Sequence, residues 1–291
     1  MTEAKEIQRV GVVGCGLMGS GIVEVCARAH LDVTAVEVDE AALASGRKRV
    51  ESSLKRAISS QKLDEDAGLA AIDRIVYSTD YESLSDRQLV IEAVIESEPD
   101  KLVVFERLGK VVDDPEAVLA SNTSSIPIMK LAMATNRPAS VVGIHFFNPV
   151  PVLPLVEVVT SLMTSEQTAD LASDFASGVL GKTVIRSKDR AGFIVNALLI
   201  PYLLSAIRMF ESGFATADDI DNGMVKGCAH PMGPLALSDL IGLDTTMAVA
   251  DSLYQEFKEQ LYAPPPLLAR MVEAGLLGRK TGRGFYNYGD R

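Results

Sequence analysis

RVGVVGCGLMGSG, residues 9–21, is the stretch from which the architecture can be worked out. Its valines predict a short buried strand at 9–13. Gly14, Gly16 and Gly19 then match the GxGxxG pattern, in which glycine permits a tight turn, close approach of a pyrophosphate to the backbone, and close packing of the next helix. Residues 20–30 carry apolar side chains at helical spacing, and amides at a helix start face a bound phosphate. The stretch therefore predicts a strand, a phosphate-binding turn and a helix.

An acidic residue follows the second predicted strand. Residues 33–36 are predicted to form this strand, and Glu37 comes directly after it. A carboxylate there accepts hydrogen bonds from both ribose hydroxyls of an adenosine and repels a 2′-phosphate. The order of strand, glycines, helix, strand and acid therefore predicts NAD, in preference to NADP, as the cofactor. The alternative is a glycine-rich turn with an incidental acid.

Strands and helices alternate along the next part of the chain. Further strands are expected at 74–76, 89–94, 118–120, 141–144, 155–159 and 183–185, with helices at 40–60, 64–73, 126–134, 165–177 and from Pro99 onward. SKDRAG, residues 187–192, has the composition of a hinge, and beyond it strand signals stop. The pattern predicts an α/β fold: a Rossmann-type, mostly parallel sheet domain at 1–187 and an all-helical domain at 188–291.

The stretch VVGIHFFNPVPVLPLVEVV, residues 141–159, contains the best candidate for acid–base chemistry. His145 ends one predicted strand and Glu157 lies in the next, with three prolines between them that exclude regular helix. A turn there brings Glu157 back beside His145, where it would fix the ring orientation and tautomer of a proton acceptor. The alternative is a histidine bonded to backbone and an acid on a solvated face.

Polar groups elsewhere have two interpretations each. SNTSS, residues 121–125, follows a strand, either as part of the ligand crevice or as a capped turn. The basic residues of the helix at 40–60 form either a solvated face or a landing site for ligand phosphates. Asn196 lies in an uncharged run, 191–207, that contains Pro201 and suits a buried helix; its amide either bonds to backbone or points at a ligand.

Composition restricts the classes of partner. The formal net charge is −11, which argues against general binding to nucleic acid or to anionic membranes. No stretch is apolar enough to span a membrane, and the first ten residues, MTEAKEIQRV, lack the apolar run of a signal peptide, so we expect a soluble cytoplasmic protein. Cys15, Cys26 and Cys228 are widely spaced, and three histidines without clustered ligands predict no metal site.

Six motifs together resemble the 3-hydroxyacyl-CoA dehydrogenase family: GVVGCGLMGSGI, SNTSS, HFFNPVPVLPLVEVV, GFIVNALLIPYLLSAI, HPMGPLALSDLIGLDT and GRKTGRGFYNY. They follow the family's order and spacing over essentially the whole chain. No enoyl-CoA hydratase portion accompanies them, so the chain is similar to the monofunctional members, which act on short substrates such as 3-hydroxybutyryl-CoA. The resemblance implies a Rossmann domain, a helical C-terminal domain that forms a homodimer, and an acyl-CoA thioester held between the two domains.

The resemblance also assigns roles to individual positions. It implies a catalytic His145 with its partner Glu157, together with Ser124 and Asn196, which also contact substrate. The implied cofactor contacts are Gly14, Gly16, Leu17, Met18, Gly19, Glu37, Glu96, Lys101 and Asn122. The implied substrate contacts further include Asn148 and Ser53. Ser60 stands where many members have a lysine near the CoA, and Lys62 is the expected substitute.

The chemistry derived from the residues agrees with the resemblance. Oxidising a secondary alcohol needs a base for the hydroxyl proton and an acceptor for the hydride. His145 is the expected base and Glu157 its support, while Ser124 and Asn196 would donate to substrate oxygens. Two alternatives stay open: the same fold acting on a free hydroxy acid or sugar acid, and an NAD-binding protein without enzymatic activity.

Overall fold

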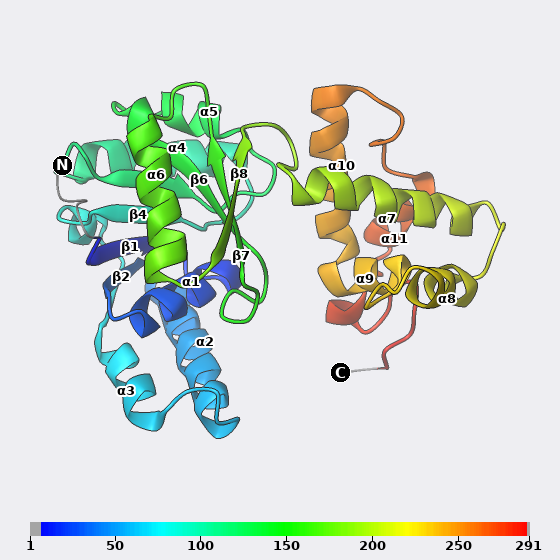
Figure 1. The fold of residues 1–291 in the computed structure, drawn as a ribbon, viewed down its shortest axis with the longest axis horizontal. Coiled ribbons are helices and arrows are strands. Elements are labelled where there is room, and N and C mark those ends of the chain that lie inside the picture. The colour runs from blue at the N-terminus through cyan, green and yellow to red at the C-terminus, as the bar shows by residue number, and fades with distance from the viewer. Residues whose placement is uncertain (1–6, 290–291) are drawn as a thin grey trace. The chain divides into compact units, whose positions relative to one another are not determined.

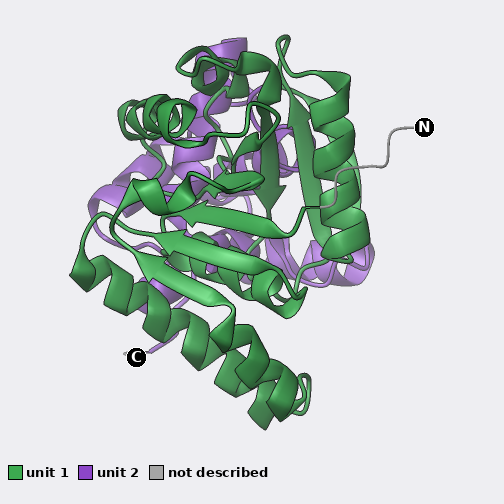
Figure 2. Cartoon of the chain, turned by 90° about the vertical axis from the view of Figure 1, so that its left-hand side faces the viewer, with its two compact units in different colours: residues 1–189 green, residues 190–291 purple. Residues whose placement is uncertain are grey.

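The computed structural model describes residues 7–289, which form two compact units, one ending at Asp189 and the other beginning at Arg190 (Figure 2). The boundary lies two residues beyond the division expected from the sequence at 187/188. Residues 1–6, on which part of the signal-peptide argument rests, lie outside the described residues. Within 7–289, no helix is long and apolar enough to cross a membrane.

Unit 1 is built on an eight-stranded sheet (Figure 1) with the order β3-β2-β1-β4-β5-β6-β7-β8. All neighbouring pairs are parallel except β6 and β7, which are antiparallel. The mostly parallel sheet predicted from the sequence is therefore confirmed. The strands are β1 (Arg9–Val13), β2 (Asp32–Val36), β3 (Ile75–Ser78), β4 (Leu89–Glu92), β5 (Val118–Ser121), β6 (Val141–Phe146), β7 (Leu155–Thr160) and β8 (Thr183–Lys188).

The inner strands are buried on both faces because helices cover the sheet. Side-chain caps start several of these helices: Asp39 accepts from the amide of Ala42, and Asp64 from that of Ala67. The helices of unit 1 are α1 (Leu17–Arg28), α2 (Glu40–Ser59), α3 (Glu65–Asp73), α4 (Glu98–Val111), α5 (Ile128–Met133) and α6 (Glu166–Asp174). Two short 3-10 helices, η1 (Tyr81–Leu84) and η2 (Pro138–Ser140), and the π-helical η3 (Phe175–Val179), which continues α6, complete the unit.

Unit 2 is helical over its described residues. It consists of α7 (Val195–Glu211), α8 (Ala217–Gly227), α9 (Pro234–Ile241), α10 (Leu243–Phe257), α11 (Pro266–Glu273) and the turn η4 (Arg279–Thr281). Its core contains Leu203, Leu204 and Leu253, all fully buried. The predicted order of the two domains, an α/β domain followed by a helical domain, is thus confirmed.

The prediction for residues 191–207 was wrong in two respects. The helix begins only at Val195, because Gly192 and Phe193 have left-handed backbone conformations, with φ of 74° and 50°, that no right-handed helix contains. It is also not a wholly buried helix: Leu198 is 73% exposed. Pro201 lies within α7, which continues without a break from Val195 to Glu211.

Four functional segments gather at one edge of the sheet in unit 1. Because β1, β4, β5 and β6 run parallel, the segments after Val13, Glu92 and Ser121 and the end of β6 at His145 all lie at the carboxyl edge. Chain order reverses about β1, since β2 lies on one side and β4 on the other. Open sheets of this kind bind ligands at that reversal.

Candidate active site

The glycine turn has the shape that a dinucleotide site needs. Gly14 has φ of 89°, and its amide donates to the carbonyl of Val36 at 2.8 Å. A Cβ on Gly19 would lie 1.8 Å from the Gly14 oxygen, so no larger residue fits. A Cβ on Gly16, in contrast, would have no neighbour within 4 Å, and no side chain caps α1. The turn is tightly packed on one side and open at the helix start, where a pyrophosphate would approach.

Glu37 is fixed against this turn. One of its carboxylate oxygens accepts from the amide of Cys15 at 2.6 Å, and the other from its own neighbour Val38 at 3.1 Å. The acid therefore stands at the end of β2 beside the glycines, as the NAD interpretation requires. Burial, and next to it the charge of Glu37, raise the pKa of the Cys15 thiol to about 12, so this cysteine stays protonated.

His145 and Glu157 are direct partners across the antiparallel strands β6 and β7. The ring Nδ1 of His145 lies 2.8 Å from Oε2 of Glu157, and the residues are 6% and 0% exposed. Phe147 packs on the imidazole with ring centroids 4.6 Å apart. The predicted placement of Glu157 beside His145 is confirmed by this hydrogen bond. Because the buried acid holds Nδ1, the orientation of the other ring nitrogen, Nε2, is also fixed.

The SNTSS segment is tied to both neighbouring strands. Asn122 accepts, through Oδ1, the amide of Phe146 at 2.9 Å, which places the segment beside the histidine strand. Glu96 accepts through a single oxygen from Thr123 Oγ1 at 2.6 Å and from the amides of Ser124 and Ser125 at 3.0 and 3.1 Å. The segment is an ordered loop at the carboxyl edge of the sheet, held by Glu96 from the segment that follows the neighbouring strand β4.

Lys101 is not on the surface. It is 1% exposed, and its Nζ lies 2.6 Å from Glu92 and 3.3 Å from Glu96. Burial alone raises the pKa of Glu96, but Lys101 and the donors of the SNTSS loop lower it further than burial raises it, so the pKa lies below its ordinary value. Glu96 therefore remains an acceptor at neutral pH.

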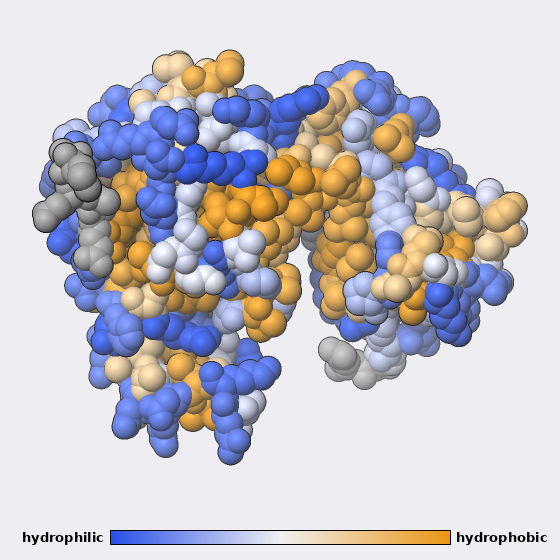
Figure 3. Space-filling view, in the orientation of Figure 1, coloured by the Kyte–Doolittle hydropathy of each residue, from blue (hydrophilic) through white to orange (hydrophobic). Residues whose placement is uncertain are grey.

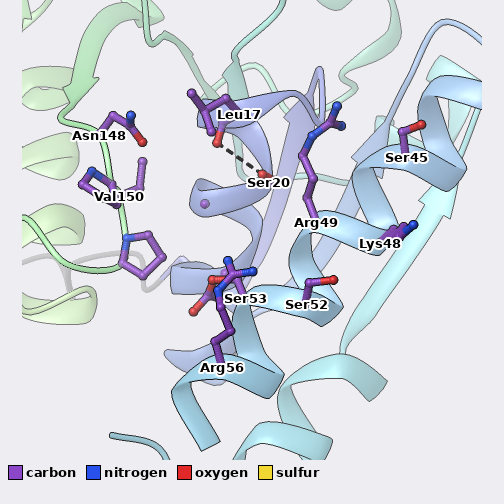
Figure 4. A pocket seen from close by; sticks show the side chains of 14 residues that line it. Leu17, Ser20, Ser45, Lys48, Arg49, Ser52, Ser53, Arg56, Asn148 and Val150 are labelled. Atoms are coloured by element: carbon purple, nitrogen blue, oxygen red, sulfur yellow. Dashed lines mark hydrogen bonds between the residues drawn. The ribbon is translucent and has the colours of Figure 1, made fainter. Parts of the chain in front are cut away.

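A cavity of about 450 Å³ opens between α1, α2 and the segment 148–151 of unit 1 (Figure 4). Ser53 and Asn148, both predicted substrate contacts, line it. So do Lys48, Arg49 and Arg56, which give the cavity a positive wall. Lys62 does not line it, since α2 ends at Ser59 and Lys62 lies beyond that end. The sequence predicted that the basic residues of the helix at 40–60 either form a solvated face or bind ligand phosphates. It did not indicate which of them line a cavity.

Asn196 belongs to unit 2. It lies in the first turn of α7 and is partly exposed, so it is not the core amide that one interpretation required. Among the described residues, no group of three or more histidine, cysteine, aspartate or glutamate side chains is arranged to hold a metal ion.

Comparisons with known proteins match both units. Residues 9–190 match "3-hydroxyacyl-CoA dehydrogenase, NAD binding domain", and residues 192–288 match "3-hydroxyacyl-CoA dehydrogenase, C-terminal domain". The chain belongs to the 3-hydroxyacyl-CoA dehydrogenase family. Its NAD-binding domain therefore carries the glycine turn, Glu37 and the histidine pair, and NAD is the cofactor of this family's first domain, as the sequence predicted.

Several members of the 3-hydroxyacyl-CoA dehydrogenase family are similar over nearly their whole length. The 3-hydroxybutyryl-CoA dehydrogenase of Mycobacterium tuberculosis is 61% identical over 97% of this chain and 99% of its own. The crystal structure of M. tuberculosis FadB2 matches with a TM-score of 0.97 and 60% identity, covering 98% of this chain and 100% of that one. That of (S)-3-hydroxybutyryl-CoA dehydrogenase from Ralstonia eutropha has a TM-score of 0.93 at 44% identity, with coverage of 98% and 100%.

Proposed function

We propose that this protein is an NAD-dependent dehydrogenase that interconverts L-3-hydroxyacyl-CoA and 3-ketoacyl-CoA, with short chains such as 3-hydroxybutyryl-CoA as substrate. The family and the names of its similar members support the substrate class. The observation that carries the chemistry is the buried His145–Glu157 pair at the carboxyl edge of a nucleotide-binding sheet. This is a base held in one tautomer where a nicotinamide would lie.

In the proposed mechanism, NAD when bound supplies the hydride acceptor. The Nε2 atom of His145 takes the proton from the C3 hydroxyl as the hydride leaves, and returns it in the reverse direction. Glu157 accepts from Nδ1, which keeps Nε2 as the proton acceptor and stabilises the imidazolium that forms. Fixing both groups on paired strands means that little reorganisation accompanies the reaction.

Other positions have supporting roles in the proposal. Ser124 and Asn196 donate to substrate oxygens, and Asn148 helps to position the substrate. Glu37 binds the adenosine ribose of NAD. Asn122, Glu96 and Lys101 lie at the SNTSS loop, on the side where it contacts the cofactor. The glycine turn, Gly14, Gly16, Leu17, Met18 and Gly19, takes the pyrophosphate.

The CoA moiety of the substrate carries phosphates, which need cations in an otherwise acidic protein. The cavity in unit 1 offers Lys48, Arg49 and Arg56 beside Ser53, and we assign it to these phosphates. Lys62 remains a second candidate, from its place in the sequence alone. A positive wall of this kind has no purpose for a small free hydroxy acid, so it favours a CoA thioester.

The direct test follows NADH absorbance with acetoacetyl-CoA and longer 3-ketoacyl-CoA thioesters. We expect turnover that declines with chain length, slower reaction with NADPH, and little with free 3-keto acids. Absence of turnover on every thioester would sink the proposed function. Turnover on free acids at equal kcat/KM would favour the alternative substrate class, and NADH binding without any turnover would favour a non-enzymatic protein.

We also propose a domain at 188–291 that binds substrate and forms a homodimer in the cytoplasm. Apolar side chains gather on the surface of unit 2 around the first half of α7 (Figure 3), where Ile194 and Leu198 are 38% and 73% exposed. Such a face suits a second copy of the chain. Sedimentation should give the mass of a dimer, and Leu198→Asp should shift it toward the monomer; a wild-type monomer would contradict the proposal.

A further inference from the structure

Glu92 is a buried acid that neither the motifs nor the proposed mechanism uses. It ends β4 and is fully buried. Its Oε1 accepts from the amide of Val94 at 2.7 Å and from Lys101 Nζ at 2.6 Å, and its Oε2 accepts from Ser121 Oγ at 2.6 Å. Val94 and Lys101 follow β4 and Ser121 is the last residue of β5, so the donors come from the carboxyl ends of these two strands and the segment after β4.

Stability does not explain this ion pair. Glu92 and Lys101 have side chains 0% and 1% exposed, so both have lost their hydration. The cost of burying two charges is offset by their attraction only in part, and apolar residues of the same size commonly serve a core equally well. A pair of this kind indicates that the charges position something else.

Two routes lead from Glu92 to the SNTSS loop. Along the first, Ser121 donates to Glu92 and accepts the amide of Thr123 at 3.1 Å. Along the second, Lys101 bridges Glu92 and Glu96, 3.3 Å from the latter. Because Glu92 already balances the charge of Lys101, Lys101 attracts Glu96 only weakly. Glu96 therefore remains free to accept hydrogen bonds from the loop.

The loop leaves one hydroxyl loosely held. Oε1 of Glu96 receives Thr123 Oγ1 at 2.6 Å and Ser125 Oγ at 2.9 Å, whereas Ser124 Oγ lies 3.4 Å away. One carboxylate oxygen cannot accept so many donors at full strength, because it offers only two lone pairs. The shorter bonds hold the loop, and the Ser124 hydroxyl can be released to another acceptor at small cost.

We propose that Glu92 is a positioning residue, which through Ser121, Lys101 and Glu96 holds the loop so that the Ser124 hydroxyl is aimed at the substrate oxygen. This inference rests on the proposed function, in which Ser124 donates to substrate. Without the charge on Glu92, Lys101 has Glu96 as its remaining carboxylate, draws it away from residues 123–125, and misplaces Ser124.

The first test is Glu92→Gln, which keeps the shape and removes the charge. We expect kcat/KM with acetoacetyl-CoA to fall roughly 100-fold, the scale of a catalytic group displaced by about 1 Å. The matched control is Glu106→Gln, which breaks the exposed pair with Lys110 on the same helix, α4, and should leave kcat/KM unchanged.

A double-mutant cycle with Ser124→Ala separates positioning from a general structural defect. If Glu92 acts through Ser124, Glu92→Gln should cost much less in the Ser124→Ala background than in the wild type. An equal loss in both backgrounds, or no loss in either, overturns the proposal. If Glu92→Gln does not fold, Ser121→Ala breaks the first route from Glu92 to the loop and leaves Lys101 in place, and the same cycle is run from that variant with the same two readings.

A binding titration distinguishes this proposal from the proposed function. In the proposed function the SNTSS loop also carries Asn122, a cofactor contact. Glu92→Gln should therefore weaken NADH binding, followed by nucleotide fluorescence, whether or not a thioester is turned over. Wild-type protein that binds NADH but turns over no thioester sinks the function. Unchanged NADH affinity in Glu92→Gln, with unchanged kcat/KM, sinks the role of Glu92.

Discussion

Two buried acids, one in each unit, show how the same costly group serves different purposes. Glu157 in the sheet of unit 1 is 0% exposed and bonds the imidazole of His145. Asp239 in α9 of unit 2 is 1% exposed and accepts from the amides of Phe285 and Tyr286, at 3.0 and 2.9 Å, and from the phenol Oη of Tyr288 at 3.0 Å.

The partners, not the burial, decide what each acid does. Asp239 holds amides and a phenol of the C-terminal segment, which keep their protons at neutral pH, so it fastens a piece of chain. Glu157 holds an imidazole, a group that can take up and release a proton during a reaction, so the charge of Glu157 bears on that reaction. Loss of the first should therefore appear in stability, and loss of the second in turnover.

The largest effect should come from His145→Gln, which removes the base and keeps a polar side chain. We expect kcat to fall roughly 10²–10⁴-fold, the usual contribution of general acid–base catalysis. NADH affinity should change little, because the glycine turn and Glu37 lie elsewhere at the edge of the sheet. Steady-state kinetics and an NADH titration check both points; lost NADH binding would mean that the role assigned to His145 is wrong.

Glu157→Gln should have the next largest effect. The amide can still contact Nδ1, but it neither stabilises an imidazolium nor selects the tautomer, so we expect kcat to fall on the order of 10²-fold. The denaturant midpoint of unfolding should shift little, whereas kcat falls. The result that would break the comparison is a variant with normal kcat and a markedly lower unfolding midpoint, since Glu157 would then resemble Asp239.

Local patterns predicted the parts of the site that depend on local chemistry. The glycine turn and the alignment of His145 with Glu157 follow from GxGxxG and from prolines between two apolar strands. The start of α7 was missed because Phe193 adopts a positive φ, which its residue type disfavours. Glu92 was missed because nothing local reveals what surrounds it; an acid inside the apolar run at 89–94 was the only signal.

The third effect, on stability, should come from Asp239→Asn. An amide offers one acceptor oxygen where the carboxylate serves Phe285, Tyr286 and Tyr288, so at least one of these part-buried donors loses its partner. We expect the free energy of unfolding to fall by about 1–3 kcal/mol. Denaturant unfolding measures it, with exposed Glu273→Gln in α11 as control; an unchanged midpoint for Asp239→Asn would contradict the tail-fastening role.

The smallest effects are the pH dependences, and these should have opposite signs in the two units. Burial raises the pKa of Asp239 above its ordinary 3.8, despite the donors around it. The folded state then binds this proton more tightly than the unfolded chain, so its contribution to stability is largest below 3.8 and declines as pH rises through the folded pKa. The deficit of Asp239→Asn should therefore narrow with rising pH.

Glu96 in unit 1 should behave in the reverse way. Its pKa lies below the ordinary 4.5, because Lys101 and the loop donors outweigh the effect of burial. Its contribution is thus present above 4.5 and is lost as pH falls through the folded pKa, so the deficit of Glu96→Gln should widen as pH rises. The unfolding midpoints of wild type, Asp239→Asn and Glu96→Gln are measured over the acidic pH range in which these carboxyl groups titrate. The difference between each variant and wild type, plotted against pH, gives one slope for each unit. Slopes of the same sign would show that the loop donors do not hold Glu96 in its charged form, and the SNTSS loop would need another anchor.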